Sequence, residues 1–454
     1  MKYFHRVITV LVMAGTAMVG SAYAAKLPSG YGIVTKEQKR AEALALRLMK
    51  SPAVLAAQKQ IEQVYGDDPV YQTPGAPEIM EAAVREVVYM TATYVATEDS
   101  QRPMLLWTFN APRKSDGVDI PGTRFIESMD SIYRVVNLDA THHYELSGKM
   151  PKDGSPAFTV FEVWNSPQGL QPDVKYMGHI AANDLVLNPD GSFKLRFGPE
   201  PAEGRKNYLQ TAKGGWLIIR QSLSDWMKQS PILNLKIRML EKPDRPAPTF
   251  AELEKRLVDV LPQATQLNRT YMHRMFEEQN GAKLYIGFGN SLNHLNPAVA
   301  TRGGAWGYVT GTRYLLGDDQ AMVITMTPGD AKYFSIVLHD AWGRTLDPYS
   351  FANRNNSVST PNPDGTVTYV IASKDPGVAN WLDTGGHGSG AVIMRWQGVT
   401  VARDGSPAEL IKDSKVVALD ELKMVLPEGV PMTSSAERCQ ALDWRKTAYE
   451  RRLK

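Results

Sequence analysis

One ordered set of features occurs twice in this chain of 454 residues. Each copy opens with an Asn-Pro-Asp-Gly turn, continues with an Asn-aromatic-Leu tripeptide and ends with an apolar run that closes on arginine. The first copy runs from Asn188 to Arg220 and the second from Asn362 to Arg395. The three features recur at offsets of 174, 173 and 175 residues. Because self-similarity at a fixed period indicates a repeated structural unit, the sequence predicts one β unit present twice.

The segments before each turn have the composition of strands. Residues 143–148 and 158–164 are rich in aromatic and β-branched side chains, which favour strands. In the second copy, 322–324 and 334–338 take the places of 145–147 and 158–162. The repeat therefore extends beyond the three features that reveal it.

Helical patterns surround the two β units. Capping boxes begin predicted helices at Thr35, Thr249 and Ser434. Pro262 is expected to end the middle helix, so that a second helix follows it in the linker. The predicted fold class is α+β: two tandem antiparallel β-sandwich or jelly-roll-like units with N-terminal, linker and C-terminal helices. The predicted segments are a signal peptide (1–24), a helical region (25–118), the first β unit (119–247), a helical linker (248–282), the second β unit (283–403) and a C-terminal tail with a helix (404–454).

The N-terminus has the pattern of a secretory leader. Lys2 and Arg6 precede an apolar stretch, 7–19, and Ala22-Tyr23-Ala24 resembles an A-x-A cleavage site. No later stretch approaches the ~20 apolar residues of a membrane span. We therefore expect a periplasmic or secreted protein with no transmembrane segment in the mature chain.

Charge and cysteine usage exclude several classes of protein. Removing Lys2 and Arg6 from the 51 basic residues leaves 49 against 48 acidic ones, so a nucleic-acid partner is not expected. The single cysteine, Cys439, excludes an internal disulfide. We expect it to be a thiol packed in a helix interface, with intermolecular pairing as the alternative. No metal, nucleotide or nucleophile-elbow motif is present, so no cofactor and no metal site is predicted.

The second unit resembles a known bacterial family, the domain of unknown function 1214. The matching residues are Tyr314-Leu315, 333–338, Asn353-Arg354, Asp364-Gly365, Asn380-Trp381-Leu382 and Arg395. The sequence departs from the family pattern at Asp383, where a proline is usual, and at Gln397-Gly398, where tyrosine and proline are usual. The resemblance implies a β-sandwich or jelly-roll unit beside a helical element, and it implies little chemistry.

The Asn-aromatic pairs are the first candidates for a binding site. Asn380-Trp381, and Asn207-Tyr208 in the first copy, each place an amide beside a flat ring just before the closing strand. Such a pair can stack on a sugar or steroid-like ring while the amide reads a hydroxyl. The alternative is that the ring plugs the end of the sandwich and the amide ties the loop.

Charged residues complete the candidate site. Arg395 is assigned to an acidic group of the ligand, with Arg220 as its first-copy equivalent, although a rim salt bridge is the alternative for both. Arg354 and His339 are included as further ligand-binding candidates. His387 lies in a glycine-rich loop that is expected to act as a lid, or simply to be an exposed flexible loop.

Two functions remain open from the sequence. The first is binding of a small ring-bearing ligand (carbohydrate, steroid or lipid-like) in an inter-unit or loop cleft. The alternative is a hydrolase or lyase acting on an exported carbohydrate or lipid-like substrate. A cluster of carboxylates, histidines or tyrosines with strongly shifted pKa values at the unit interface would favour the enzyme.

Overall fold

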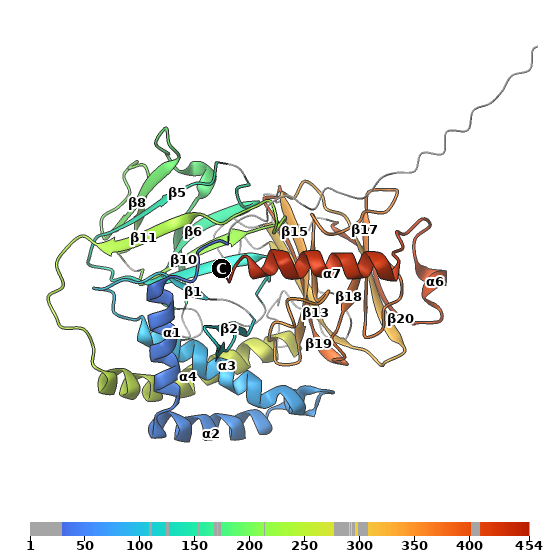
Figure 1. Cartoon of the computed structure of the whole chain (residues 1–454), viewed down its shortest axis with the longest axis horizontal. Coiled ribbons are helices and arrows are strands. Elements are labelled where there is room, and N and C mark those ends of the chain that lie inside the picture. The colour runs from blue at the N-terminus through green and yellow to red at the C-terminus, as the bar shows by residue number, and fades with distance from the viewer. Residues whose placement is uncertain are drawn as a thin grey trace, which may run out of the picture.

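The structure is a computed structural model of the whole chain, and it describes most of residues 30–453 (Figure 1). Not described are 1–29, 109–110, 124–126, 153, 168–169, 171–173, 213, 277–289, 291, 293–295, 298–306, 401–408 and 454. The predicted signal peptide lies outside the described residues.

Four long helices form one layer of the molecule. They are α1 (Lys36–Met49), α2 (Pro52–Gly66), α3 (Ala76–Ala96) and α4 (Phe250–Phe276), with a short 3-10 turn, η2 (Pro69–Gln72), before α3. Thr35 caps α1 as predicted, because its side chain accepts the Gln38 N–H. The predicted pair of linker helices is wrong: α4 continues through Pro262 as one helix. Buried residues lie both before Pro262, at Leu257 and Leu261, and after it, at Ala264, so packing offsets the lost bond.

The first β unit is a sandwich of a five-stranded and a four-stranded sheet. The strand order in the larger sheet is β1 (Leu106–Thr108), β4 (Ser131–Asn137), β10 (Trp216–Ser222), β6 (Phe158–Trp164) and β7 (Tyr176–Ala181). The smaller sheet has the order β11 (Leu233–Met239), β5 (Tyr144–Lys149), β8 (Ser192–Gly198) and β9 (Tyr208–Gln210). A hairpin of β2 (Arg113–Ser115) and β3 (Val118–Ile120) precedes β4, and η3 (Ala182–Asp184) follows β7. Alternate residues such as Leu146, Leu195 and Leu217 fill the space between the sheets.

The second β unit has the same construction. Its larger sheet has the order β12 (Asn296–Pro297), β13 (Gly307–Leu315), β19 (Ser389–Gln397), β15 (Tyr333–Asp340) and β16 (Asn353–Asn355). Its smaller sheet has the order β18 (Trp381–Asp383), β17 (Val367–Ala372), β14 (Gln320–Met326) and β20 (Ile411–Ala418). In both units, the short strand that begins at the aromatic residue of the Asn-aromatic-Leu tripeptide pairs in parallel with the strand before it. These pairs are β9 with β8 and β18 with β17. The two units therefore share one topology, as the repeat predicts.

The two turns that revealed the repeat are also equivalent in detail. In each, the N–H of glycine, Gly191 or Gly365, donates to the carbonyl of the turn asparagine, and both glycines have φ of 83°. Each turn aspartate accepts the N–H and the hydroxyl of the residue two positions later. A left-handed residue is required at the fourth position, and glycine adopts it without strain.

For the segments before the turns, the sequence pairs the correct strands of the two units. It aligns their residues one position away from the register in the structure. Leu146 pairs with Leu195, whereas Ile324 pairs with Tyr369, the repeat equivalent of Leu195. The true equivalent of residue 146 is therefore 324. Likewise Phe158 corresponds to Tyr333, since both face the last residue of the central strand. A slip of one residue reverses the face of each side chain, which composition alone does not reveal.

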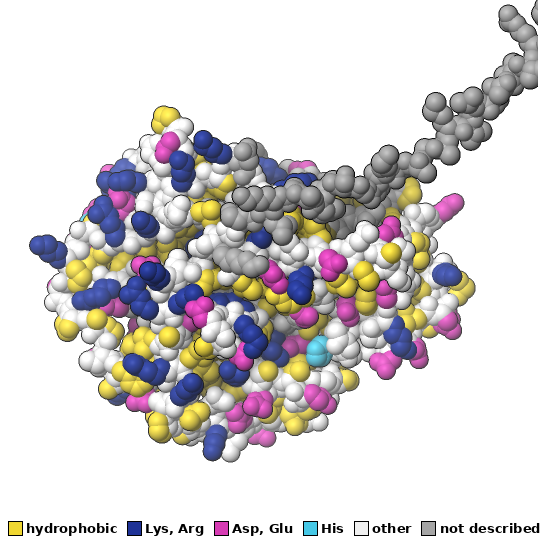
Figure 2. All heavy atoms as spheres, viewed as in Figure 1, with side chains coloured by type: hydrophobic (Ala, Val, Ile, Leu, Met, Phe, Trp, Pro, Cys, Tyr) yellow, Lys and Arg dark blue, Asp and Glu magenta, His cyan; other side chains and the backbone are white. Residues whose placement is uncertain are grey.

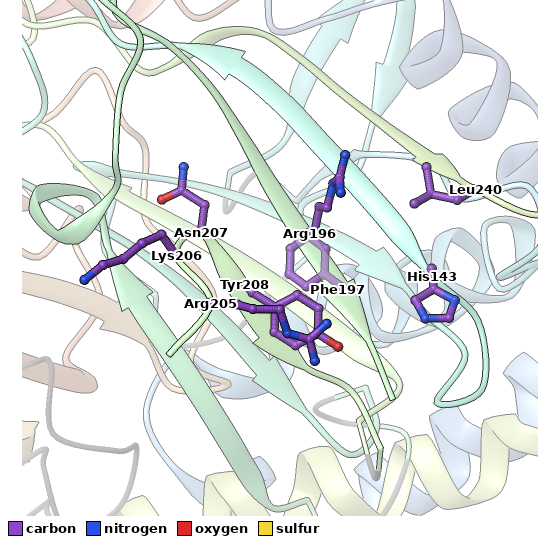
Figure 3. A pocket seen from close by; sticks show the side chains of 8 residues that line it. All are labelled: His143, Arg196, Phe197, Arg205, Lys206, Asn207, Tyr208 and Leu240. Carbon is purple, nitrogen blue, oxygen red and sulfur yellow. The ribbon is translucent and has the colours of Figure 1, made fainter. Parts of the chain in front are cut away.

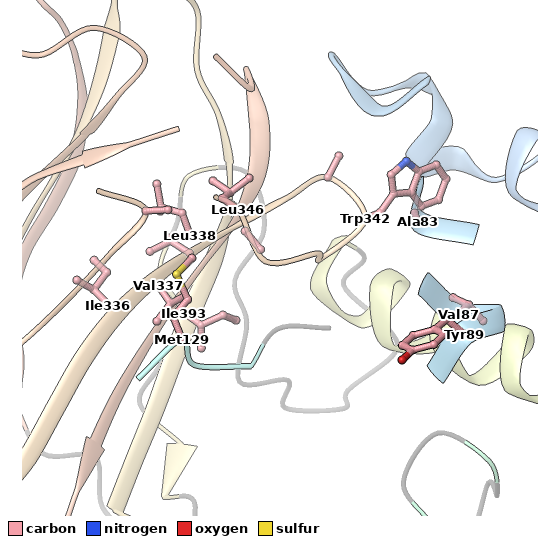
Figure 4. Close-up of a cluster of buried hydrophobic side chains, with 14 of the residues drawn as sticks. Ala83, Val87, Tyr89, Met129, Ile336, Val337, Leu338, Trp342, Leu346 and Ile393 are labelled. Carbon is pink, nitrogen blue, oxygen red and sulfur yellow. The ribbon is translucent and has the colours of Figure 1, made fainter. Parts of the chain in front are cut away.

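The helical layer packs against both units. Tyr94 of α3 and Ala264 of α4 contact Trp216 and Ile218 on the outer face of the first unit's larger sheet. Figure 4 shows the other contact, where Trp342 of the second unit lies beside Ala83 of α3 in one buried cluster. Among the described residues, no helix is long and apolar enough to cross a bilayer.

The C-terminal region belongs to the second unit and extends past it. Strand β20 pairs along β14, so this unit reaches Ala418, beyond the predicted boundary at 403. A short helix, α6 (Leu422–Val425), and a long one, α7 (Ser435–Glu450), follow it. Helix α7 lies across both units (Figure 1). Cys439 on α7 is exposed, so its predicted role as a packed thiol is wrong.

Candidate functional site

The amides of the two Asn-aromatic pairs share one structural role. Asn380 Oδ1 accepts the Thr360 N–H at 2.8 Å and its Nδ2 donates to the Thr360 carbonyl at 2.7 Å. Asn207 makes the same two bonds, at 2.8 and 2.7 Å, to Val186. Each amide thus braces the chain just before the Asn-Pro-Asp-Gly turn, which is the loop-tying alternative considered above.

Trp381 is half-buried and is fixed by several protein contacts. Its Nε1 donates to the Ala372 carbonyl at 3.0 Å, and its ring lies 6.0 Å from the Phe351 ring. The Arg438 guanidinium of α7 stacks 5.3 Å from the ring centroid. Arg354 donates to the Trp381 carbonyl at 3.1 Å, and burial lowers the pKa of Arg354 to about 9. Trp381 and Arg354 therefore form part of the surface on which α7 packs.

Arg220, Arg395 and His339 lie on a different face, in a buried layer between the two units. Arg220 donates to Glu162 Oε2 at 2.6 Å and is only 2 % exposed. Burial and the nearby Arg395 charge lower the pKa of His339 to about 3, so it is neutral. Arg395 extends from the outer face of the larger sheet, whereas Trp381 packs on the outer face of the smaller one. The structure therefore does not bring Arg395 and Trp381 into one site.

His387 and the first-copy pair occupy two further places. His387 is half-buried beside Gly75, at the start of α3, and Ser389 near it donates to the Pro74 carbonyl at 2.9 Å. This glycine-rich loop rests on the helical layer. Asn207 and Tyr208 line a cavity of the first unit. The nine predicted site residues are thus divided among four places.

The cavity beside Tyr208 has a volume of about 370 Å³ (Figure 3). Its lining comprises His143, Arg196, Phe197, Arg205, Lys206, Asn207, Tyr208 and Leu240. The Arg205 guanidinium lies 3.9 Å from the centroid of the Tyr208 ring. His143 contacts Glu241 at 2.6 Å and Glu200 at 3.0 Å, and these hydrogen bonds raise the pKa of His143.

A larger cleft lies between α3, the β2–β3 hairpin, the loop after β15 and the end of the chain. Its volume is about 530 Å³. The lining comprises Ala82, Arg85, Glu86, Pro112, Arg113, Lys114, Asp119, Ile120, Pro121, Arg344, Tyr349, Tyr449 and Leu453. The helical layer, the first unit's hairpin and the second unit all contribute to it, so the cleft exists only in the assembled fold.

Glu86 is a buried acid in the lining of this larger cleft. Its side chain is 4 % exposed, and Oε1 lies 3.0 Å from Arg344 Nε. Arg344 also forms an ion pair with Asp340, whose Oδ2 lies 3.4 Å from Arg344 Nη1. The pKa of Glu86 is raised to about 7, mainly by burial and also by the Asp340 charge, against the lowering effects of Arg344 and the Gly122 N–H. Near neutral pH the carboxyl of Glu86 can therefore either donate or accept a proton.

The remaining wall combines paired cations with aromatic rings. Arg113 contacts Glu42 at 2.5 Å, and Lys114 contacts Asp119 at 2.7 Å. The rings of Tyr349 and Tyr449 meet edge to face, with centroids 5.6 Å apart. Within the described ranges, no three His, Cys, Asp or Glu side chains are arranged to hold a metal ion.

Glu86 belongs to no motif, although the sequence of α3 carries a signal for it. From residue 83 to 95 the α3 sequence carries only two charges, Arg85 and Glu86. Arg85 is exposed, but Glu86 lies on the face that packs into the molecule. An acid at a core position of an apolar helix requires a partner, and that requirement is itself the signal.

The fold and the cleft define a tandem β-sandwich protein whose two units share a helical layer. Both units match the family described as "Protein of unknown function (DUF1214)", over residues 133–222 and 312–400. The family's model therefore matches the chain twice, once in each β unit, which confirms the resemblance and the tandem repeat.

Two solved structures are similar to this chain. An uncharacterized protein from Burkholderia cenocepacia has 22 % identity and a TM-score of 0.62, covering 83 % of this chain and 99 % of that one. A protein from Vibrio parahaemolyticus has 11 % identity and a TM-score of 0.38, covering 64 % of this chain and 90 % of that one. No curated protein matches the chain. The Burkholderia structure supports the fold alone.

Proposed function

We propose that this protein binds a small, ring-bearing ligand in the cleft beside Glu86. The observation that supports the proposal most is a buried carboxyl on the wall of a cleft of about 530 Å³. Ligand pockets usually measure ~300–1,000 Å³ and combine an apolar lining with a few fixed polar groups. Buried groups with shifted pKa values gather at such sites.

The lining indicates the chemistry of the ligand. Ala82, Ile120 and Leu453 offer apolar contacts, and Tyr349 and Tyr449 offer flat rings. An apolar ring system packs well against such a wall. A hydroxyl or carbonyl at one end of the ligand would reach Glu86 and Arg344. Among the ring-bearing classes, this composition favours a steroid-like or lipid-like molecule over a carbohydrate.

A second candidate function is acid–base catalysis in the same cleft. The observation that favours it is the pKa of about 7 for Glu86. A general acid or base works best when its pKa lies near the working pH. In this alternative, the protein is a hydrolase or lyase acting on a carbohydrate or lipid-like substrate, and Glu86 transfers the proton.

The experiment is a thermal-shift screen of small molecules on the wild type and on two matched variants. Ala82→Trp fills the cleft from α3, and Ala53→Trp adds the same ring to an exposed position of α2. We expect hits that raise the melting temperature of the wild type and of Ala53→Trp but not of Ala82→Trp. Hits that stabilise Ala82→Trp equally would contradict the proposal. Product analysis of each hit, with Glu86→Gln as the variant, decides between binding and catalysis.

We also propose that the protein is exported to the periplasm or the medium, because its N-terminus has the pattern of a leader that is cleaved after Ala24. Intact-mass analysis of the protein recovered from those compartments tests this. The expected species begins at Ala25, and a species that retains Met1 would contradict export by this route.

A further inference from the structure

The outer face of the first unit's smaller sheet carries rows of cations. In one row, Glu145 of β5 pairs with Arg196 of β8 on one side and Arg238 of β11 on the other. In the next row, Ser147 lies between Lys194 and Lys236. Figure 2 shows Lys and Arg side chains gathered over this part of the first unit.

A single acid serves three of these cations. Glu145 lies 2.9 Å from Arg238, 3.3 Å from Lys194 and 3.4 Å from Arg196. Its side chain is 5 % exposed, while those of the three cations are 62–66 % exposed. Burial opposes ionisation of Glu145, but Arg238 and Lys194 hold its pKa below the usual value. The carboxylate therefore lies beneath a surface that presents positive charge to solvent.

The same surface continues into the cavity beside Tyr208. Lys206 and Lys236 are exposed and have no ion pair among the described residues. Arg205 stacks on the Tyr208 ring and donates Nε to the Ala202 carbonyl, which orients its guanidinium. Counting Lys194, Arg196, Arg205, Lys206, Lys236 and Arg238 against Glu145, this basic face has six cations and one acid. His143, Glu200 and Glu241 border its far end.

The second unit provides an internal control. In the row equivalent to Arg238, Glu145 and Arg196, it has Lys415, Val323 and Val370. Val323 and Val370 are buried in an apolar cluster with Leu422 of α6 and the residues that follow β20. One topology thus supports both an apolar, covered face and a basic, open one. The fold does not require the cations of the first unit.

We infer that the basic face and the cavity at its end bind an acidic polysaccharide. A polyuronate carries its charge on the sugar ring, so successive carboxylates can contact the cations of the sheet. One terminal or bent ring can enter the cavity of about 370 Å³ beside Tyr208 and offer its carboxylate to Arg205. This site is separate from the cleft beside Glu86 and does not depend on the function proposed for it.

The cavity favours a polysaccharide over other polyanions. A bilayer surface is flat and presents no ring to fill it. Duplex DNA keeps its bases stacked inside the helix and offers only phosphates to a sheet of this kind. Of these three polyanions, only the glycan satisfies both the cations of the sheet and the aromatic edge of the cavity.

The test measures binding of alginate oligosaccharides to the full mature chain, with neutral malto-oligosaccharides of equal length as the comparison. The variant is Lys206→Gln with Lys236→Gln, which breaks no ion pair within the described structure. The matched control is Lys423→Gln with Lys446→Gln, two exposed lysines of α6 and α7. We expect alginate binding that weakens as salt shortens the Debye length from about 30 Å to about 8 Å. We also expect the basic-face variant to lose about tenfold in affinity and the control to be unchanged.

Three results would overturn the inference. They are equal binding of the neutral glycan, equal losses in the two double variants, and tighter binding of phosphatidylglycerol vesicles or duplex DNA than of alginate. A second variant, Arg205→Gln, tests the cavity separately. It is expected to weaken alginate binding while the melting temperature stays the same, because Arg205 is exposed.

Discussion

Asn380 and Asn207, the two asparagines that brace the loops, differ in their exposure to solvent. Asn380 is fully buried and also donates to the Thr368 carbonyl at 3.2 Å. Asn380→Ala leaves buried backbone groups of the loop without partners, each costing about 1–3 kcal/mol, so we expect a loss of roughly 2–4 kcal/mol in the free energy of unfolding. Urea denaturation measures it.

The first-unit brace is the matched control. Asn207 is half-buried and has φ of 49°, so Asn207→Gly keeps the backbone conformation and lets water replace the lost bonds. We expect a loss of about 1 kcal/mol or less. If the two variants lose equal stability, burial does not decide the strength of the brace.

Glu86 makes stability depend on pH. Its pKa is raised to about 7 in the folded chain, while in the unfolded chain it is close to 4.5. Between these values the folded state retains a proton that the unfolded state has released, so stability falls as the pH rises through this window. Glu86→Gln removes this effect. The variant should gain roughly 3 kcal/mol relative to the wild type between pH 4.5 and pH 7.

The measurement is urea denaturation of both proteins at several pH values. A difference in stability that stays constant between pH 4.5 and pH 7 would show that Glu86 is ionised throughout. The exposed acid of the same wall gives the control. Asp119 is not buried and its pKa is lowered by Lys114, so Asp119→Asn should leave the pH profile in this window unchanged.

At the residue scale, the sequence shows which residues recur but not where each of them lies in the fold. The repeat identified Asn207, Asn380 and Arg395 because their spacing recurs. Their function depends on which face of which sheet they occupy, and a register error of one residue reverses that face. Glu86 lies outside the repeat, so repetition did not reveal it.

Helix α7 is the element that joins the two units. Arg438 forms two bonds of 2.9 Å to Asp375 of the second unit and donates to the Ala379 carbonyl. At the other end, Arg451 donates to the Trp226 carbonyl of the first unit at 2.7 Å. The intermediate Arg445 stacks 4.7 Å from the Trp226 ring.

Arg438→Ala should detach the first turns of α7. It removes a bidentate ion pair and leaves buried carbonyls without donors, so we expect a loss of roughly 2–3 kcal/mol in the free energy of unfolding. Faster hydrogen exchange across 434–442 is the accompanying measurement. The control is Ser434→Ala, which removes one side of the capping box and should cost about 1 kcal/mol. Unchanged exchange in Arg438→Ala would contradict this role.

At the element scale, the sequence predicted most helices and strands because their periodicities are local. Strand β6 matches the predicted 158–164, and the capping boxes at Thr249 and Ser434 are both formed. The failure at Pro262 depends on tertiary packing. Pro262 does not end α4, because that helix is buried against α3.

On the scale of the whole molecule, equivalent ends of the two units meet. Ser222 closes β10 and Gln397 closes β19, and Ser222 Oγ lies 2.9 Å from Gln397 Oε1. Nearby, buried Asp130 of the first unit accepts the hydroxyl of Tyr333 at 2.7 Å and the amide of Asn353 at 2.9 Å. The two units and α7 therefore pack against one another, and this packing forms the cleft beside Glu86. Contacts between residues some 200 positions apart left no periodic trace in the sequence.

That the cleft beside Glu86 binds a small ligand is tested most directly by calorimetric titration of the strongest screening hit at pH 7. Measured in two buffers of different ionisation enthalpy, the titration gives the number of protons exchanged on binding. A ligand whose carbonyl accepts a hydrogen bond from the neutral carboxyl of Glu86 stabilises that form and raises its pKa further, so the wild type should take up protons. Glu86→Gln should bind without proton uptake, and Ala82→Trp should not bind. Equal proton uptake by Glu86→Gln, or unchanged affinity in Ala82→Trp, would contradict the assignment of this cleft.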